Sequence, residues 1–299
     1  MNASAGPALP VYGVAILAVF LSSSIDAIVK YAGPTAGLHI LLAWRFFFGA
    51  IIALFVYRLR SRQVIRAASV RFHAARGLIQ LLSVSLYFYS ITQLSLAVAT
   101  VLSFTSVLFV LPVATVVLGE RVSAVAVLAA VTGFVGVAIT VLDISGLDHS
   151  LEVIRPVGVA AGLASGCLTA VLLVFLRLRS ASEDPHVISL FTNLVPAIVL
   201  LPVLTGMFGA PSLREIFVFV ILGVLGYSVW FLLSVAYARA PARVLAPTEY
   251  LSVAIAALYG YAFFGEGIEF RMIAGIAVII CSCLLVTRGR LKQSHENHF

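Results

Sequence analysis

The feature that most constrains this chain is a series of apolar runs, each about 20 residues long, that fills it from residue 11 to residue 287. A run of that length is what an α-helix needs to cross the hydrocarbon core of a bilayer. Only 10% of the 299 residues are charged, whereas soluble domains carry roughly 25% and need them to keep their surface wet. The sequence therefore predicts an all-α integral membrane protein. A β-barrel is not expected, because its strands would be about 10 residues long and would alternate apolar with polar side chains.

The apolar runs predict ten transmembrane helices joined by short loops, several of which are marked by glycine, proline or charged residues. We place the spans at 11–30, 37–57, 75–95, 97–117, 122–142, 156–176, 186–206, 214–236, 243–264 and 269–287.

Lysine and arginine are distributed unevenly between the two sides of this predicted bundle. One side receives 14 of the 19 basic residues, the other receives 4, and Arg45 lies inside a span. Cytoplasmic loops carry the excess of Lys and Arg in membrane proteins. We therefore expect cytoplasmic tails at 1–10 and 288–299 and an external linker at 143–155, in a multi-pass protein of the bacterial inner membrane. The net charge of +7 has the same explanation, so no nucleic-acid partner is expected.

The second half of the chain repeats the first. Leu-Gly-Glu at 118–120 recurs as Phe-Gly-Glu at 264–266, a shift of 146 residues that also superposes neighbouring spans. The predicted halves, 11–142 and 156–287, have five spans each. Because five is odd, the two halves cross the membrane in opposite directions. Inverted repeats of this kind are an architecture of secondary transporters, which bind substrate near the midplane between the halves.

Three stretches carry a resemblance to a known family: Ala-Thr-Val-Leu-Ser-Phe-Thr at 99–105, Leu-Gly-Glu-Arg at 118–121 and Ala-Pro-Thr-Glu-Tyr at 246–250. Together with the two five-helix halves, they resemble the EamA-type carriers of the drug/metabolite transporter superfamily, over roughly the whole of 11–287. The resemblance implies a carrier that moves amino acids, including aromatic or hydrophobic ones, or similar small metabolites by alternating access, in the export direction.

Two alternatives to amino-acid export remain at this stage. One is uptake of riboflavin or S-adenosylmethionine, and the other is a membrane-embedded enzyme. The sequence has no His-Glu-x-x-His zinc motif and no Gly-rich loop ending in Lys-Ser or Lys-Thr for nucleotide phosphates. We therefore expect no enzyme activity, cofactor or metal. The expected partners are a small-molecule substrate and the lipid bilayer, and we expect a monomer or weak homodimer.

Three charged residues lie within predicted spans, where a charge is costly and usually faces a cavity or a partner. Arg45 lies about 12 Å from the outer end of its span and Glu249 about 10 Å from the inner end. We interpret them as a clamp for a zwitterion, with Arg45 binding a carboxylate and Glu249 binding an amine or a coupling proton. The alternative is a buried structural pair, or side chains that reach to the interface. Asp26 is expected to pair with Lys30 one turn later.

Aromatic side chains predict a pocket for a small amphiphilic substrate. Tyr87, Tyr89, Trp230 and Tyr250 are the candidate lining residues. The alternative is an interfacial belt, in which Tyr and Trp are enriched at span ends.

Small and acidic residues at other positions predict structural roles. Gly158, Gly162 and Gly166 form two successive Gly-xxx-Gly steps on one helix face, which favours close packing of another helix, with a dimer contact as the alternative. Glu120 and Glu266 each follow a glycine at the end of a span. A carboxylate near a helix start accepts hydrogen bonds from free N–H groups, so we expect them to cap helices.

The charge asymmetry makes a direct topological prediction. In a variant without Cys167, Cys281 and Cys283, a cysteine introduced at Asp148 is expected to react with a membrane-impermeant thiol reagent in right-side-out cells, whereas one introduced at Arg66 is not. If the cysteine at position 66 reacts from outside and the one at position 148 does not, the orientation of the protein is opposite to the one predicted here.

Overall fold

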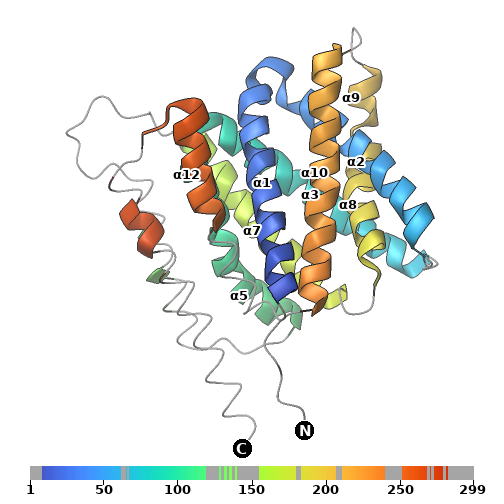
Figure 1. Ribbon diagram of the computed structural model, residues 1–299. Coiled ribbons are helices and arrows are strands. Elements are labelled where there is room, and N and C mark those ends of the chain that lie inside the picture. The colour runs from blue at the N-terminus through green and yellow to red at the C-terminus, as the bar shows by residue number, and fades with distance from the viewer. Residues whose placement is uncertain are drawn as a thin grey trace, which may run out of the picture. The chain divides into compact units, whose positions relative to one another are not determined.

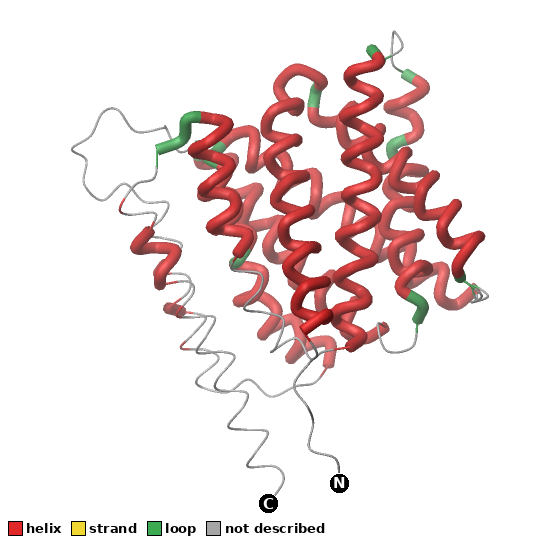
Figure 2. The backbone as a smooth tube through the Cα atoms, in the orientation of Figure 1, coloured by secondary structure: helices red, strands yellow, loops and turns green. Residues whose placement is uncertain are grey.

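The computed structural model describes residues 9–61, 65, 67–118, 128, 131–132, 135–136, 139, 155–179, 183–206, 211–239, 251–267, 270, 273–278 and 281. Within these residues all regular secondary structure is helical (Figure 2). Four helical segments are long and apolar enough to cross a membrane, namely Gly13–Ala36, Leu38–Arg60, Pro156–Leu176 and Leu213–Arg239. For the described part of the chain, the expected all-helical membrane protein is confirmed.

The helices are α1 (Leu9–Ala36), α2 (Leu38–Arg60), α3 (Ala67–Gln93), α4 (Leu96–Ser103), α5 (Thr105–Leu118), α7 (Pro156–Arg179), α8 (Pro185–Val199), α9 (Leu201–Thr205), α10 (Leu213–Arg239) and α12 (Leu251–Phe264). The first, second, third, sixth and eighth predicted spans coincide with single helices. The fifth and tenth spans lie mostly outside the described residues, as do residues 243–250 of the ninth.

The fourth and seventh predicted spans are each divided into two helices. In the fourth span, α4 ends at Ser103 and is followed by Phe104. There the hydroxyls of Ser103 and Thr105 donate to the carbonyls of Thr100 and Leu102 at 2.7 and 2.6 Å. Hydroxyls that bond back to the helix backbone bend it. In the seventh span, Pro196 lies inside α8 and a second proline opens α9. Because proline has no N–H to donate, the helical hydrogen bonding is interrupted between them.

The chain forms two compact units. Unit 1 comprises Met1–Ser85 and Phe175–Ser252, and unit 2 comprises Leu86–Val174 and Val253–Phe299. Each unit therefore combines a segment from the first half of the sequence with a segment from the second half.

Unit 1 is built on contacts of α10 with α1, α2 and α8, and of α2 with α8. Figure 1 shows α10 between α1 and α2. The helices approach closely at glycines. A Cβ added to Gly223 of α10 would lie 2.7 Å from the backbone nitrogen of Gly49 on α2. Small residues at helix contacts are the means by which membrane helices pack in the absence of a hydrophobic drive between them.

Unit 2 contains the three glycines of α7. A Cβ on Gly158 would lie 2.8 Å from the Cβ of Gln93, and one on Gly162 would lie 2.9 Å from the Ser90 hydroxyl and 3.0 Å from Leu102. One on Gly166 would lie 3.3 Å from the Leu102 carbonyl oxygen. The glycine face of α7 is therefore occupied by α3 and α4 of its own unit.

Glu266 caps a helix in unit 2. Its carboxylate oxygens accept from the backbone N–H of Leu96, the first residue of α4, at 2.9 and 3.1 Å. The predicted capping role is confirmed for Glu266, but the helix that it caps is α4 rather than the tenth predicted span. Glu120 lies outside the described residues.

The packing of α7 generates a stability prediction. Gly162→Ala is expected to lower the free energy of unfolding by about 1–3 kcal/mol, the usual effect of overpacking, since its new methyl group has no room. Gly13→Ala is the matched control on α1, where nothing lies within 4 Å of the added Cβ. The control is expected to gain about 0.5–1 kcal/mol from the better helix propensity of alanine. Unfolding in detergent measures both, and equal stabilities would contradict the packing.

Candidate functional site

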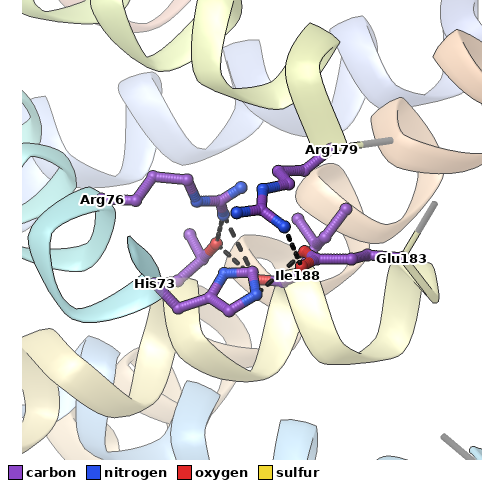
Figure 3. A network of polar contacts seen from close by, with 6 residues as sticks. His73, Arg76, Arg179, Glu183 and Ile188 are labelled. Atoms are coloured by element: carbon purple, nitrogen blue, oxygen red, sulfur yellow. Dashed lines mark hydrogen bonds and ion pairs between the residues drawn. The ribbon is translucent and has the colours of Figure 1, made fainter. Parts of the chain in front are cut away.

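Among the described residues of unit 1, two groups of side chains contain buried charged residues. The first is Arg45 with its surroundings on α1, α2 and α10. The second, which we call the His73 cluster, consists of His73, Arg76, Arg179, Glu183, Thr192 and the backbone carbonyl of Ile188 (Figure 3).

Arg45 is enclosed by three helices. It lies on α2 with only 4% of its surface exposed, and its guanidinium carbon lies 4.5 Å from the centroid of the Phe46 ring. A Cβ on Gly226 of α10 would come within 2.9 Å of Arg45 Nη2, so the missing side chain there leaves room for the guanidinium. Asp26 of α1 is also buried and interacts electrostatically with Arg45. The sequence predicts a pair of Asp26 with Lys30 and does not indicate the interaction with Arg45.

The other predicted site residues are distributed as follows. Trp230 on α10 and Arg45 on α2 both belong to unit 1. Tyr87 and Tyr89 lie on the part of α3 that belongs to unit 2. Tyr87 is half-buried and Tyr89 is 37% exposed. Glu249 and Tyr250 lie outside the described residues. The clamp of Arg45 with Glu249, and the shared aromatic pocket, therefore stay predictions.

His73 is the most buried member of the His73 cluster. It is fully enclosed, and its ring stacks on Phe191 of α8 with the ring centroids 4.8 Å apart. Its Nε2 lies 2.9 Å from Oε2 of Glu183, in the connection between α7 and α8. The pair joins residues 110 positions apart in the sequence.

Arg76 connects the cluster to α8 and α10. It follows His73 by three residues, on the same side of α3, and only 3% of its surface is exposed. Its Nη2 donates to the Ile188 carbonyl at 3.2 Å and to the Thr192 hydroxyl. Its guanidinium carbon lies 5.6 Å from the centroid of the Trp230 ring, within the range of a cation–π interaction.

Arg179, at the end of α7, is the second guanidinium group close to Glu183. Its Nη1 lies 3.5 Å from Glu183 Oε1, and its guanidinium packs over the ring of Phe72 at 4.7 Å. One carboxylate therefore faces a histidine and two guanidinium groups.

Two members of the His73 cluster, His73 and Glu183, lie outside the predicted membrane spans. His73 precedes the span at 75–95, and Glu183 lies between the spans at 156–176 and 186–206. Burial lowers the pKa of His73 to about 4, and the nearby charges of Arg76 and Arg179 act in the same direction. Burial raises the pKa of Glu183, against the opposing influence of Arg179, Arg76 and the Ser69 hydroxyl. Both shifts disfavour the charged form, as burial does in general.

Sequence reasoning missed the His73 cluster because its basic members fall where loop charges were expected. One signal was present in the sequence. His73, Arg76, Gln80 and Ser83 recur at helical spacing, and the structure shows that all four are buried. Glu183 stands in a short polar connection, and no local pattern joins it to His73. Within the described residues, no group of three or more His, Cys, Asp or Glu side chains is arranged to hold a metal ion.

The lowered pKa of His73 gives a pH prediction. Between its ordinary pKa of 6.5 and the folded value of about 4, the unfolded chain takes up a proton on this histidine that the folded protein does not. The wild type is therefore expected to lose stability relative to His73→Gln as the pH falls through this window. Glu183→Gln controls for the carboxylate, whose raised pKa makes stability fall with rising pH. Unfolding curves at several pH values test this, and a constant difference between wild type and His73→Gln would contradict it.

Comparison with known proteins places this chain among membrane transporters. It is 27% identical over 284 residues to the S-adenosylmethionine uptake transporter of Rickettsia conorii, covering 95% of this chain and 94% of that protein. It is also 27% identical over 280 residues to the pseudopaline exporter CntI of Pseudomonas aeruginosa, covering 93% and 95% of the two chains.

A solved structure shares the fold. It superposes with a TM-score of 0.62 at 18% identity, over 91% of this chain and 98% of that one. The sequence model of the EamA-like transporter family matches residues 9–142 and, a second time, residues 156–288. Since these two matches cover nearly the whole chain, the protein belongs to the EamA-like transporter family.

Proposed function

We propose that this transporter moves small metabolites bearing an amino-acid group, aromatic and hydrophobic amino acids included, across the bacterial inner membrane by alternating access and in the export direction. The observation that carries the proposal is the burial of Arg45 inside an apolar bundle. An arginine near the centre of a membrane helix costs about 2.5–3.5 kcal/mol on insertion scales. A role in binding a substrate carboxylate accounts for its presence there.

The surroundings of Arg45 fit a zwitterion. The guanidinium fork binds a carboxylate through two parallel hydrogen bonds. Asp26 supplies a carboxylate that interacts with Arg45 within unit 1, and in the proposal it or Glu249 receives the substrate amine. Trp230, Tyr87, Tyr89 and Tyr250 are proposed to contact the apolar part of the substrate.

The relatives support the substrate class and also a second candidate. S-adenosylmethionine contains the amino-acid group of methionine, so a carrier for it needs the same recognition of carboxylate and amine. Uptake of S-adenosylmethionine is therefore the second candidate function, favoured by the match to the Rickettsia transporter over 95% of this chain. Riboflavin lacks an amino-acid group and fits Arg45 less well.

The transport mechanism follows from the proposed architecture of ten spans in two inverted halves. Two matches of one family model, at 9–142 and 156–288, support a repeat with nearly the bounds derived from the sequence. Five spans in each half imply opposite orientations and a substrate site between the halves. The glycines of α7 already contact helices of unit 2, which supports a monomer or weak homodimer over a Gly-xxx-Gly dimer.

The role of Arg45 is tested by substitution. Counterflow of radiolabelled phenylalanine or methionine into proteoliposomes is expected to fall at least about tenfold in Arg45→Lys, because an ammonium cannot reproduce the guanidinium fork. A tenfold loss corresponds to a loss of about 1.4 kcal/mol in binding free energy. Arg71→Lys, at an exposed position on α3, is the control and should stay within about twofold of wild type.

The substrate class is tested in the same proteoliposomes. Unlabelled amino acids are expected to compete for counterflow, and their methyl esters, which lack the carboxylate, are expected not to. S-adenosylmethionine and riboflavin serve as further competitors that separate the candidate substrates. Equal competition by acids and esters, together with wild-type rates in Arg45→Lys, would remove Arg45 from substrate binding.

A further inference from the structure

Neither His73 nor Glu183 is among the residues proposed above to bind substrate. We propose that the His73–Glu183 pair binds a proton that the carrier exchanges with the solution during transport, so that substrate movement is coupled to proton movement. This inference rests on the proposed transport function and adds a coupling ion to it. It assigns the coupling to residues other than Glu249.

The geometry of the pair suits a proton site. His73 Nε2 and Glu183 Oε2 lie 2.9 Å apart, close enough for a proton taken up by one group to be shared with the other. The second ring nitrogen, Nδ1, has no hydrogen-bond partner among the described residues, although His73 is fully enclosed. A proton that Glu183 takes up and shares with His73 therefore displaces no hydrogen bond of the ring. A proton, unlike a metabolite, needs no cavity.

Protonation of the His73–Glu183 pair changes its attraction to the charged residues around it. Arg76 faces it from α3 and Arg179 from α7, Ser69 supplies a hydroxyl, and α8 contributes the uncharged ring of Phe191. With a neutral histidine, the pair carries one negative charge that attracts both guanidinium groups. Uptake of one proton from the solution cancels that charge. The attraction that holds α3, the end of α7 and the connection to α8 together is then weakened.

The shifted pKa of Glu183 supports exchange of a proton between the pair and the solution. Burial raises the pKa of Glu183 above its ordinary value, which favours the protonated carboxyl. Residues that exchange protons in function commonly have a pKa shifted by burial and by a specific charged partner. Because the two groups are coupled, the proton belongs to the pair rather than to either residue.

A physical connection runs from this pair to Arg45 along α10. Arg76 stacks on Trp230, and Arg45 packs against Gly226, four residues earlier on the same helix. Residues four apart lie on one helix face. A shift of Arg76 on protonation therefore acts on α10 one turn from the guanidinium that is proposed to bind substrate.

Proteoliposomes with a pH-sensitive dye inside test the coupling. In the wild type, amino-acid transport is expected to move protons, and a pH gradient is expected to drive accumulation. Glu183→Gln and His73→Gln are expected to keep counterflow within about threefold, since exchange needs no net proton movement, but to lose proton flux and gradient-driven accumulation at least tenfold. Glu215→Gln, at the start of α10 where the carboxylate accepts from Ser212, is the matched control and keeps both.

Three outcomes would overturn the proposal. Wild-type protein that transports amino acids without moving protons would remove the coupling while leaving the transport function intact. Proton flux that persists in Glu183→Gln and His73→Gln would exclude the pair. Loss of flux in Glu249→Gln alone would assign the coupling to that residue.

A measurement that needs no substrate covers the case in which a variant does not fold or no substrate is transported. Infrared difference spectra of the purified wild type between acidic and neutral pH are expected to show the band of a buried, protonated carboxyl group. This band is expected to be absent in Glu183→Gln. If that variant does not fold, the band is expected to be shifted in His73→Gln. Wild-type spectra without a band that either variant changes would show that Glu183 does not take up a proton, which overturns the inference independently of transport.

Discussion

The cost of placing a charge among apolar helices shapes unit 1 more than any other single interaction. A buried ion is tolerated where an opposite charge and hydrogen bonds surround it, and removal of one partner leaves an uncompensated charge. Arg45 interacts with Asp26 across α1 and α2. Arg76 and Arg179 share Glu183 with His73, and Arg76 adds a carbonyl, a hydroxyl and an aromatic ring. These polar contacts join helices that are otherwise held by apolar packing.

The close approach of helix backbones is the second element of the architecture. Lipid tails are as apolar as leucine side chains, so membrane helices gain little from burying leucine and associate through packing and polar contacts. Gly223 brings α10 against the backbone of α2, and the absence of a side chain at Gly226 leaves the space that Arg45 occupies. On α7, Gly158 and Gly162 admit Gln93, Ser90 and Leu102 in unit 2. Glycine thus serves both the packing of the helices and the placement of a buried cation.

Helix α10 connects the two polar groups of unit 1. Its successive turns present Gly226 to Arg45 and Trp230 to Arg76, and it contacts α1, α2 and α8. The residues proposed to bind substrate and the residues proposed to bind a proton therefore both contact α10. The relatives compared above are an uptake transporter and an exporter, and coupling to an ion is one means by which a carrier's direction can be set.

The sequence by itself determined the membrane class, the family and the helices at the first, second, third, sixth and eighth predicted spans, because apolar runs of helical length are local properties that do not depend on tertiary contacts. It also identified Arg45 as a buried cation, since an arginine within an apolar run has few alternatives to burial or snorkelling. The tertiary structure decided the partners. Asp26 meets Arg45 across two helices, Glu183 meets His73 across 110 residues, and Glu266 caps α4 from 170 residues away. No spacing rule encodes such contacts, because they depend on which helix faces pack together. For the same reason, Arg76 is expected from the sequence to be a loop charge, whereas in the structure it is buried against α8 and α10.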